Sequence, residues 1–343
     1  MQHKKRNTPL LLFILLITVL SSCNKKVSYE GRIIKDYEWK TISHFSVEEN
    51  CVTTVKANDS CIVLTVCNKI KKFDYSGHLL QTIVPDSTNY ICSYDKEGSN
   101  YWVNDDNFRE VKYYNKNNKL LKRQLIDTQS RIQYFGRNRF IVPDLDEKKN
   151  IYTMSLYDAI KDTVLKEINI CKLTGVLDTI PVRGGSITFT NSFCKNEKGQ
   201  VLAYYRYNSS FIFIDTSFIA TAYQDFRKLP VGTPSLKGHN VLLKPINCGI
   251  DCAAMDDKFI YLVTPTYQCK QWKKSENDRM LDVYDISTKK YLGSVKFPIS
   301  KGKSVFSIAK TAKGFVVSYV GGYSGIEIVI FKNDFTINFR YCS

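Results

Sequence analysis

Hydrophobic and polar positions alternate along this chain in short runs, and the runs recur as a unit. The first complete unit spans residues 59–84 and contains an apolar run, a half-polar run that ends on Asp74, a turn at Ser76-Gly77 and a third run. Short runs rich in Tyr, Val, Ile and Thr, separated by turn residues, predict β-strands. Because no long amphipathic helical pattern is found, the sequence predicts an all-β fold.

An Asp or Asn marks the end of the expected third strand in each of six units. The markers are Asp74, Asn115, Asp158, Asp215, Asp285 and Asn333. An Asp or Asn in this place can accept a hydrogen bond from the backbone two residues on and so set the following turn. The steps between markers, 41, 43, 57, 70 and 48 residues, indicate a repeated supersecondary unit. The longer steps require insertions, which we place near 171–185, 225–247 and 265–279.

Each unit also contains an expected inner strand and an expected second strand. The second strands are 61–66, 101–104, 140–142, 201–207, 259–263 and 315–320. The inner strands, which would surround a channel, are 51–55, 90–94, 132–135, 187–193, 250–255 and 305–310. One four-stranded antiparallel sheet cannot bury both of its faces alone, whereas sheets packed radially bury them and leave only short edges. We therefore predict a six-bladed β-propeller over residues 46–343.

The sequence allows two ways of closing the ring. Residues 31–39 form an extended piece that could complete the last blade, as an N-terminal strand commonly does in propellers. The last unit, however, contains enough apolar runs to supply four strands of its own. Both solutions remain open at this level.

The N-terminus resembles a bacterial lipoprotein signal. Residues 4–6 are all basic, and the apolar run 10–20 is too short to span a bilayer but has the length of a signal-peptide core. The run ends in Leu20-Ser21-Ser22-Cys23, which resembles a lipobox. The resemblance implies a signal peptide at 1–22, cleavage before Cys23 and acylation of that cysteine, with palmitate for example. The alternative is a short membrane anchor with a chance cysteine.

The repeat pattern and the lipobox together resemble the TolB-like six-bladed propeller lipoproteins of the Bacteroidetes. The units lack the Gly-His and Trp-Asp signals of WD40 repeats. The resemblance implies a lipid-anchored envelope protein with a lead-in at 23–45, held by more than one acyl chain. Asn24-Lys25-Lys26 is not an acidic surface-export tag, which favours the periplasmic side of the outer membrane.

The chain is basic, with a formal net charge of +16, or +13 without residues 1–22. Such an excess can attract nucleic acid, anionic lipid or acidic glycans. The lysines are dispersed and form no dense run, so a solvated surface that protects strand edges is the simpler interpretation. Because an exported protein does not meet nucleic acid, we expect no nucleic-acid partner.

Ten cysteines follow Cys23. An oxidising compartment permits disulfides, but most of these cysteines lie in apolar runs, where a free thiol behaves as a small hydrophobic group. We therefore expect mostly buried thiols. Cys248 and Cys252 have the wrong spacing for a Cys-x-x-Cys pair, and the few histidines make a His-rich metal site unexpected.

Strand order places two sets of loops on one face of the predicted ring, which we call the loop face: those that lead into the inner strands and those between second and third strands. The candidate ligand-binding residues there are Tyr90, Arg109, Arg131, Arg183, Asn247, Trp272, Lys303 and Tyr323. Arginine and lysine around one mouth would suit an anionic ligand, and Tyr and Trp could stack on sugars or anchor a partner protein. The simpler interpretation is solvated charge and aromatic caps on the blades.

Three acids, Asp251, Asp105 and Asp144, are candidates for binding calcium or another divalent cation. Asp251 lies on an expected inner strand and is the best candidate for a channel acid, although it could simply face channel water. Some six-bladed propellers are metal-dependent lactonases, but their ligands cannot be aligned here. No phosphate loop, nucleophile elbow or triad is recognisable, so we assign no catalytic residue and expect no required cofactor.

These features favour a non-catalytic binding or scaffolding module of the cell envelope. Its lipid would attach it to the membrane, and its partner would be a peptide, a glycan or an envelope protein. The alternative is a metal-dependent propeller hydrolase or lyase with its site in the central channel. The fold alone cannot decide between them, because propellers host many functions.

Overall fold

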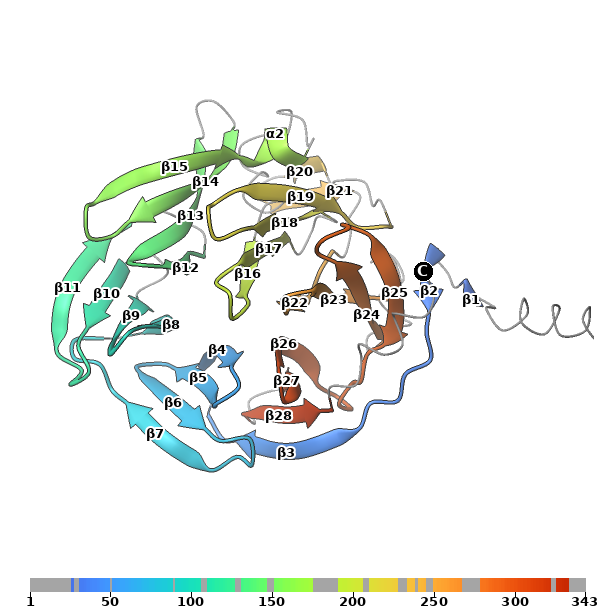
Figure 1. Ribbon diagram of the computed structural model, residues 1–343, viewed down its shortest axis with the longest axis horizontal. Coiled ribbons are helices and arrows are strands. Elements are labelled where there is room, and N and C mark those ends of the chain that lie inside the picture. The colour runs from blue at the N-terminus through green and yellow to red at the C-terminus, as the bar shows by residue number, and fades with distance from the viewer. Residues whose placement is uncertain are drawn as a thin grey trace, which may run out of the picture.

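The computed structural model describes most of the chain from Lys26 onward. The described residues are 26–27, 31–49, 51–88, 90–105, 110–126, 131–146, 151–174, 191–205, 210–227, 233–237, 240–244, 249–266, 278–321 and 325–332. Their strands form a ring of sheets around a common axis (Figure 1). The ring has six blades of four antiparallel strands, as the sequence predicts.

The first four blades follow the chain in order. Blade one contains β4 (Val52–Ala57), β5 (Ile62–Val66), β6 (Lys69–Phe73) and β7 (Leu79–Ile83); blade two contains β8 (Ile91–Glu97), β9 (Asn100–Asp105), β10 (Glu110–Tyr114) and β11 (Leu120–Leu125). Blade three contains β12 (Gln133–Gly136), β13 (Arg139–Asp146), β14 (Ile151–Asp158) and β15 (Thr163–Asn169); blade four contains β16 (Asn191–Lys195), β17 (Val201–Tyr205), β18 (Ser210–Ile214) and β19 (Ala220–Gln224).

The last two blades take strands from both ends of the chain. Blade five contains β22 (Cys252–Met255), β23 (Phe259–Pro265), β24 (Arg279–Asp285) and β25 (Tyr291–Lys296), and its sheet is extended by β2 (Ile33–Ile34) and β1 (Lys26–Val27). Blade six contains β26 (Ser304–Thr311), β27 (Gly314–Val320), β28 (Ile326–Phe331) and β3 (Thr41–Val47).

Two of the three predicted insertions contain elements where the long repeat steps require them, and residues 267–277 of the third lie outside the described residues. The short helix α2 (Ile170–Thr174) follows blade three, and the hairpin of β20 (Thr233–Lys237) and β21 (Asn240–Lys244) follows blade four. The described parts of the expected inner and second strands agree with the observed ones to within one or two residues at most ends, and residues 187–190 and 206–207 lie outside the described residues.

The Asp and Asn markers set the turns into the outer strands, as predicted. At four of the five described markers the side chain accepts a hydrogen bond from the amide two residues on: Asp74 from Ser76 at 2.8 Å, Asn115 from Asn117 at 2.9 Å, Asp158 from Ile160 at 3.0 Å and Asp215 from Ser217 at 2.9 Å. Asp285 accepts instead from the amide of Thr288 at 2.7 Å. Asn333 lies outside the described residues.

The ring closes in neither of the two ways that the sequence allowed. The fourth strand of blade six is β3, which pairs antiparallel with β28 from Val47↔Ile326 to Thr41↔Phe331. The expected closing piece, 31–39, lies outside blade five instead, where Ile34 pairs in parallel with Ser294 (Figure 1). β3 suits the closing position because Phe45 and Val47 pack into the cluster between blades six and one.

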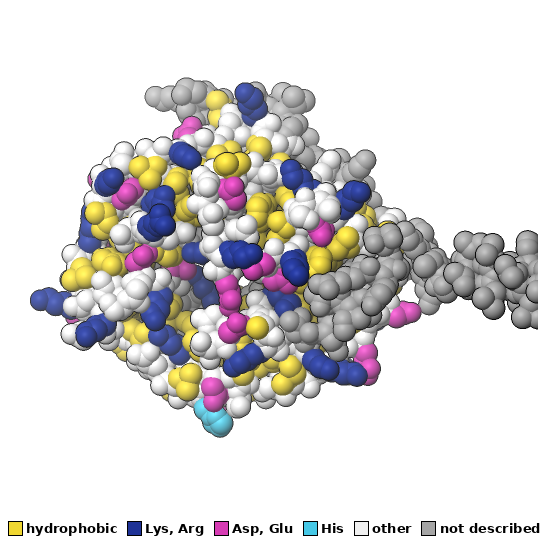
Figure 2. Space-filling view, viewed as in Figure 1, with side chains coloured by type: hydrophobic (Ala, Val, Ile, Leu, Met, Phe, Trp, Pro, Cys, Tyr) yellow, Lys and Arg dark blue, Asp and Glu magenta, His cyan; other side chains and the backbone are white. Residues whose placement is uncertain are grey.

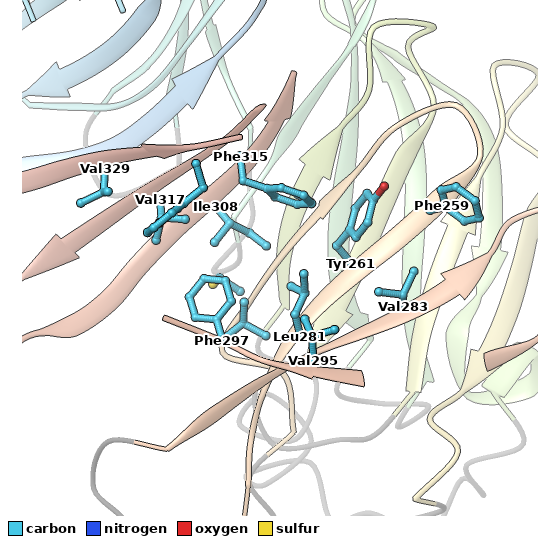
Figure 3. Close-up of a cluster of buried hydrophobic side chains, with 14 of the residues drawn as sticks. Phe259, Tyr261, Leu281, Val283, Val295, Phe297, Ile308, Phe315, Val317 and Val329 are labelled. Carbon is cyan, nitrogen blue, oxygen red and sulfur yellow. The ribbon is translucent and has the colours of Figure 1, made fainter. Parts of the chain in front are cut away.

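The apolar core is divided among the six contacts between neighbouring blades. Six clusters of buried side chains are found in the described residues, and each cluster draws from two adjacent blades. Figure 3 shows the cluster between blades five and six, where Tyr261 and Phe315 meet edge to face at 4.9 Å between ring centres. Successive residues of a strand point to opposite faces of its sheet, so each blade serves two clusters.

Candidate functional site

The loop face contains only part of the predicted mouth within the described residues. Tyr90, Arg131 and Lys303 are described, as are the three candidate acids. The other predicted residues, Arg109, Arg183, Asn247, Trp272 and Tyr323, lie outside the described residues, as does Cys23.

Tyr90 and Asp105 are brought together at the start of blade two. The backbone N–H of Tyr90 donates to Oδ1 of Asp105 at 2.9 Å, while the Tyr90 side chain is 41% exposed. Burial raises the pKa of Tyr90, and the neighbouring thiols of Cys51 and Cys92 act in the same direction. Asp105 thus holds the backbone that leads into the inner strand β8, while the phenol of Tyr90 stays at the surface.

Asp105 belongs to a buried network of charges. Its carboxylate is also paired with Nζ of Lys112, which donates to the carbonyl of Ser87 at 2.6 Å and lies 3.3 Å from Glu110 Oε2. Glu110 is in turn paired with Arg123. Buried ions are tolerated when paired and hydrogen-bonded in this way. A cation at Asp105 would have to compete with Lys112.

The three candidate acids lie in three different blades. Asp251 directly precedes the inner strand β22 and is paired with Arg279 at the start of β24. Asp144 lies on β13 and is exposed. In the parts of the chain that the structure describes, no three His, Cys, Asp or Glu residues are grouped so that they could hold a metal ion.

Lys303 forms a charged cluster at the closing strand of blade six. Its Nζ lies 2.8 Å from Oε2 of Glu327, which also accepts from Ser300 Oγ at 2.7 Å, and His44 on β3 lies 2.7 Å from Oε1. Burial alone would raise the pKa of Glu327. The hydrogen bonds from Lys303 and Ser300 and the charges of Lys303 and His44 outweigh it, so the pKa lies below its ordinary value.

Replacing Glu327 with glutamine should therefore lower the stability in a pH-dependent way. Because the pKa is lower in the folded chain, the stabilisation is present above the ordinary pKa of 4.5 and is lost as the pH falls through the folded pKa. We expect a loss of about 1 kcal/mol at pH 7 that shrinks below pH 4. Urea unfolding of both proteins at the two pH values measures it. A loss that is equal at both pH values would contradict this assignment.

Arg131 lies on the loop face before blade three. It precedes the inner strand β12, is exposed, and its positive charge reaches Tyr204 of blade four. The described members of the predicted mouth thus form separate local groups: Tyr90 with Asp105, Lys303 with Glu327, and Asp251 with Arg279. Arg279 and Glu327 were not predicted. Their signal would have been a charge at the start of a strand, since Arg279 is the first residue of β24 and Glu327 the second of β28.

The opposite end of the ring, which we call the turn face, is formed by the hairpin turns at which the inner strands end. Lys56, Lys195 and Lys310 each lie within one residue of the end of an inner strand. Nζ of Lys56 donates to Asp95 Oδ1 at 2.8 Å and to the carbonyl of Tyr94 at 3.0 Å, so it joins blades one and two.

Burial lowers the pKa of both Lys195 and Lys310. The charges of Asp95 and Glu97 partly offset this effect at Lys195, and those of Asp256 and Asp59 offset it at Lys310. The ammonium of Lys195 lies 5.0 Å from the ring centre of Tyr134. Figure 2 shows acidic and basic side chains intermixed around the middle of the ring. The sequence analysis did not identify these lysines, although each recurs at the same place in its unit.

The N-terminal segment 31–40 crosses the outside of blades five and six, and we call it the strap. Arg32, 1% exposed, reaches into blade five: its Nε donates to Asp282 Oδ1 at 3.3 Å and its Nη2 to Thr264 Oγ1 at 3.1 Å. Trp39 donates its indole N–H to the carbonyl of Lys296 at 2.7 Å and packs against the cluster between blades five and six. The strap therefore fixes the N-terminal segment to the ring.

Comparison with solved structures agrees with the ring architecture. A member of the DUF4221 family from Bacteroides vulgatus has a TM-score of 0.54 at 12% identity, over 86% of this chain and 98% of that chain. A protein of Bacteroides fragilis described as exported has a TM-score of 0.52 at 11% identity, over 86% and 94%. The Pan2 WD40 domain of Neurospora crassa has a TM-score of 0.50 at 10% identity, over 89% and 99%.

These similarities show the fold alone, because the identities are low. No protein-family model and no curated protein matches the sequence. The two Bacteroides proteins share the propeller fold, and the TolB-like resemblance stays a prediction. Among the described residues, no helix has the length and apolar character needed to cross a membrane.

Proposed function

We propose that this protein is a lipid-anchored propeller of the cell envelope that acts as a binding or scaffolding module for an envelope protein, a peptide or a glycan. The observation that supports it best is the strap. The strap ties the chain that follows Cys23 to the rim of the ring through Arg32 and Trp39. A lipid on Cys23 would then hold the ring by its rim and leave both faces free for a partner.

The short stretch of chain between Cys23 and the ring would keep the lipid close to the ring. Cys23 precedes Lys26 by three residues, which extend over at most about 11 Å. Lys26 begins β1, which pairs with β2 at the edge of blade five. A membrane-inserted lipid would therefore bring the blade-five edge next to the bilayer. The exported description of the Bacteroides fragilis neighbour agrees with such a location.

The loop face is our candidate for the partner surface. Tyr90 presents a 41% exposed ring there, while its backbone is held by the buried Asp105. Tyr side chains that are held in place and partly exposed are favoured at interfaces, because they bury a large area for little loss of side-chain entropy. Exposed Arg131 adds a positive charge on the same face.

The anchor is tested by replacing Cys23 with alanine. The natural protein is expected in the membrane fraction and to resist extraction with high salt and alkaline carbonate, because acyl chains supply about 0.8 kcal/mol for each buried CH₂. The alanine variant should be soluble. Retention of the variant in the membrane fraction would refute the lipid anchor.

The partner surface is tested by photo-cross-linking in intact envelopes. A benzophenone amino acid is placed at Tyr90 in one variant and at Leu121 in another; Leu121 is 52% exposed near the turn-face end of the outer strand β11 and serves as the control. A discrete cross-linked species from position 90 alone is expected. Cross-linking from neither position, or equally from both, would argue against the loop face as the binding surface.

A further inference from the structure

Two cysteines face each other at the loop-face end of blade one. Cys51 directly precedes β4 and Cys67 directly follows β5. These strands are antiparallel with Val52 opposite Val66, and the N–H of Cys67 donates to the carbonyl of Cys51 at 3.0 Å. The next residues outward, Cys51 and Cys67, therefore lie opposite each other where the pairing of β4 with β5 ends.

Cross-strand partners of this kind have a separation that suits a disulfide. Residues that lie opposite each other in an antiparallel pair have Cα atoms about 4.5–5.5 Å apart. Disulfides bridge Cα atoms that are about 4.4–6.8 Å apart. The neighbouring thiol of Cys51 raises the pKa of the Cys67 thiol, which agrees with two side chains that lie close together. The hairpin could thus accept the bond without a large backbone movement.

The backbone at Cys67 is fixed by a tight turn. Cys67 is the first residue of the two-residue turn between β5 and β6 and has a φ of +45°. A left-handed conformation costs about 1–2 kcal/mol for a residue with a Cβ atom, and glycine or asparagine usually occupies it. This tight turn holds the backbone of Cys67 next to Cys51, whose carbonyl accepts its N–H.

The turn also supports the neighbouring blade. The carbonyl of Cys67 accepts from the N–H of Ile91 at 2.5 Å, and Ile91 begins the inner strand of blade two. The thiol of Cys51, together with burial, raises the pKa of Cys67 to about 11. The thiol of Cys67 is therefore protonated at neutral pH and does not start the exchange reaction.

We propose that Cys51 and Cys67 form a disulfide bond that cross-links the first hairpin of blade one beside Tyr90 on the loop face. Its formation in the cell depends on the export that is part of the proposed function. The oxidant is the disulfide of a thiol-oxidising protein. The Cys51 thiolate attacks that disulfide and forms a mixed disulfide, with one oxidant thiolate leaving.

The second step completes the transfer of electrons. Cys67 loses its proton and attacks the sulfur of Cys51, so the new S–S bond forms and the second oxidant thiolate leaves. Two electrons pass to the oxidant, and the two protons of the cysteines end on its two thiols. The closed loop would be expected to raise the melting temperature by roughly 5 °C.

The test oxidises the purified full chain, carrying Cys23→Ala for solubility, with glutathione disulfide. Free thiols are then alkylated and the tryptic peptides are identified by mass spectrometry. We expect a linked pair of peptides that contain Cys51 and Cys67, and a melting temperature above that of the reduced protein. Cys67→Ser should abolish both the link and the temperature difference.

Cys61→Ser is the matched control, because Cys61 shares the tryptic peptide of Cys67 but lies at the other end of the same hairpin. The link should persist in this variant. Full alkylation of Cys51 and Cys67 in the folded wild type, or a link from Cys51 to Cys92 instead, would overturn the proposal. Since the reaction needs neither lipid nor partner, its failure is separate from a failure of the proposed function.

Discussion

Replacing Arg32 with alanine should destabilise the propeller by about 3–5 kcal/mol. The change leaves the carboxylate of Asp282, fully buried in blade five, without its cationic partner. It also removes the hydrogen bonds from the Arg32 Nη2 to Thr264 Oγ1 at 3.1 Å and to the carbonyl of Pro265 at 3.0 Å. Burying an unpaired charge is among the most destabilising single changes.

Denaturant unfolding of the purified protein measures this effect. Lys40→Ala is the matched control, because Lys40 lies on the same strap, is 60% exposed and is 4.0 Å from an exposed glutamate. It should change the stability by less than about 0.5 kcal/mol. The double variant Arg32→Met/Asp282→Leu should recover much of the loss, since buried pairs can be replaced by apolar residues. Equal effects of Arg32→Ala and Lys40→Ala would show that the strap does not hold blade five.

Replacing Gly325 with alanine should prevent normal closure of the ring. A Cβ atom at this position would lie 2.4 Å from the carbonyl oxygen of Val47, the last residue of β3, and 3.1 Å from Cα of Glu48, which follows it. The φ of +88° is also unfavourable for a residue with a side chain. We expect a loss above about 3 kcal/mol, because backbone atoms cannot move aside without breaking the pairing of β3 with β28.

Gly98→Ala separates the cost of the close contact from the cost of the left-handed backbone. Gly98 has a φ of +61°, but nothing lies within 4 Å of an added Cβ atom. Its replacement should cost only about 1–2 kcal/mol, the price of the left-handed backbone. Thermal and denaturant unfolding of the two variants gives the difference. If the two losses are equal, the close contact between Gly325 and the closing strand is not important for stability.

The repeat could be predicted because its signals are local. Asp215, for example, binds the amide of Ser217 two residues away, so neither the turn nor its marker depends on the rest of the ring. The inner strands were predicted from the same kind of short-range signal, the alternation of apolar and polar runs. Once six such units are present, burial of both faces of each sheet favours a radial arrangement.

The candidate site was harder to predict because its charges are paired over long sequence distances. Asp251 is paired with Arg279 and Lys303 with Glu327, each partner lying more than twenty residues away on another strand. Asp105 looked like a loop acid but is buried with Lys112. A sequence pattern identifies the charged residues, but it does not show which of them a neighbouring strand neutralises.

The sequence by itself determined the all-β class, the six units and the turns between their strands. These features depend on contacts between residues that are close along the chain. Only the tertiary structure decided that Thr41–Val47, and not residues 31–39, completes blade six. Both segments can form strands, and the choice depends on the fit of one of them against β28, almost three hundred residues away. Such a fit is a property of the closed ring, because the apolar surface that selects the strand does not exist until the blades are assembled.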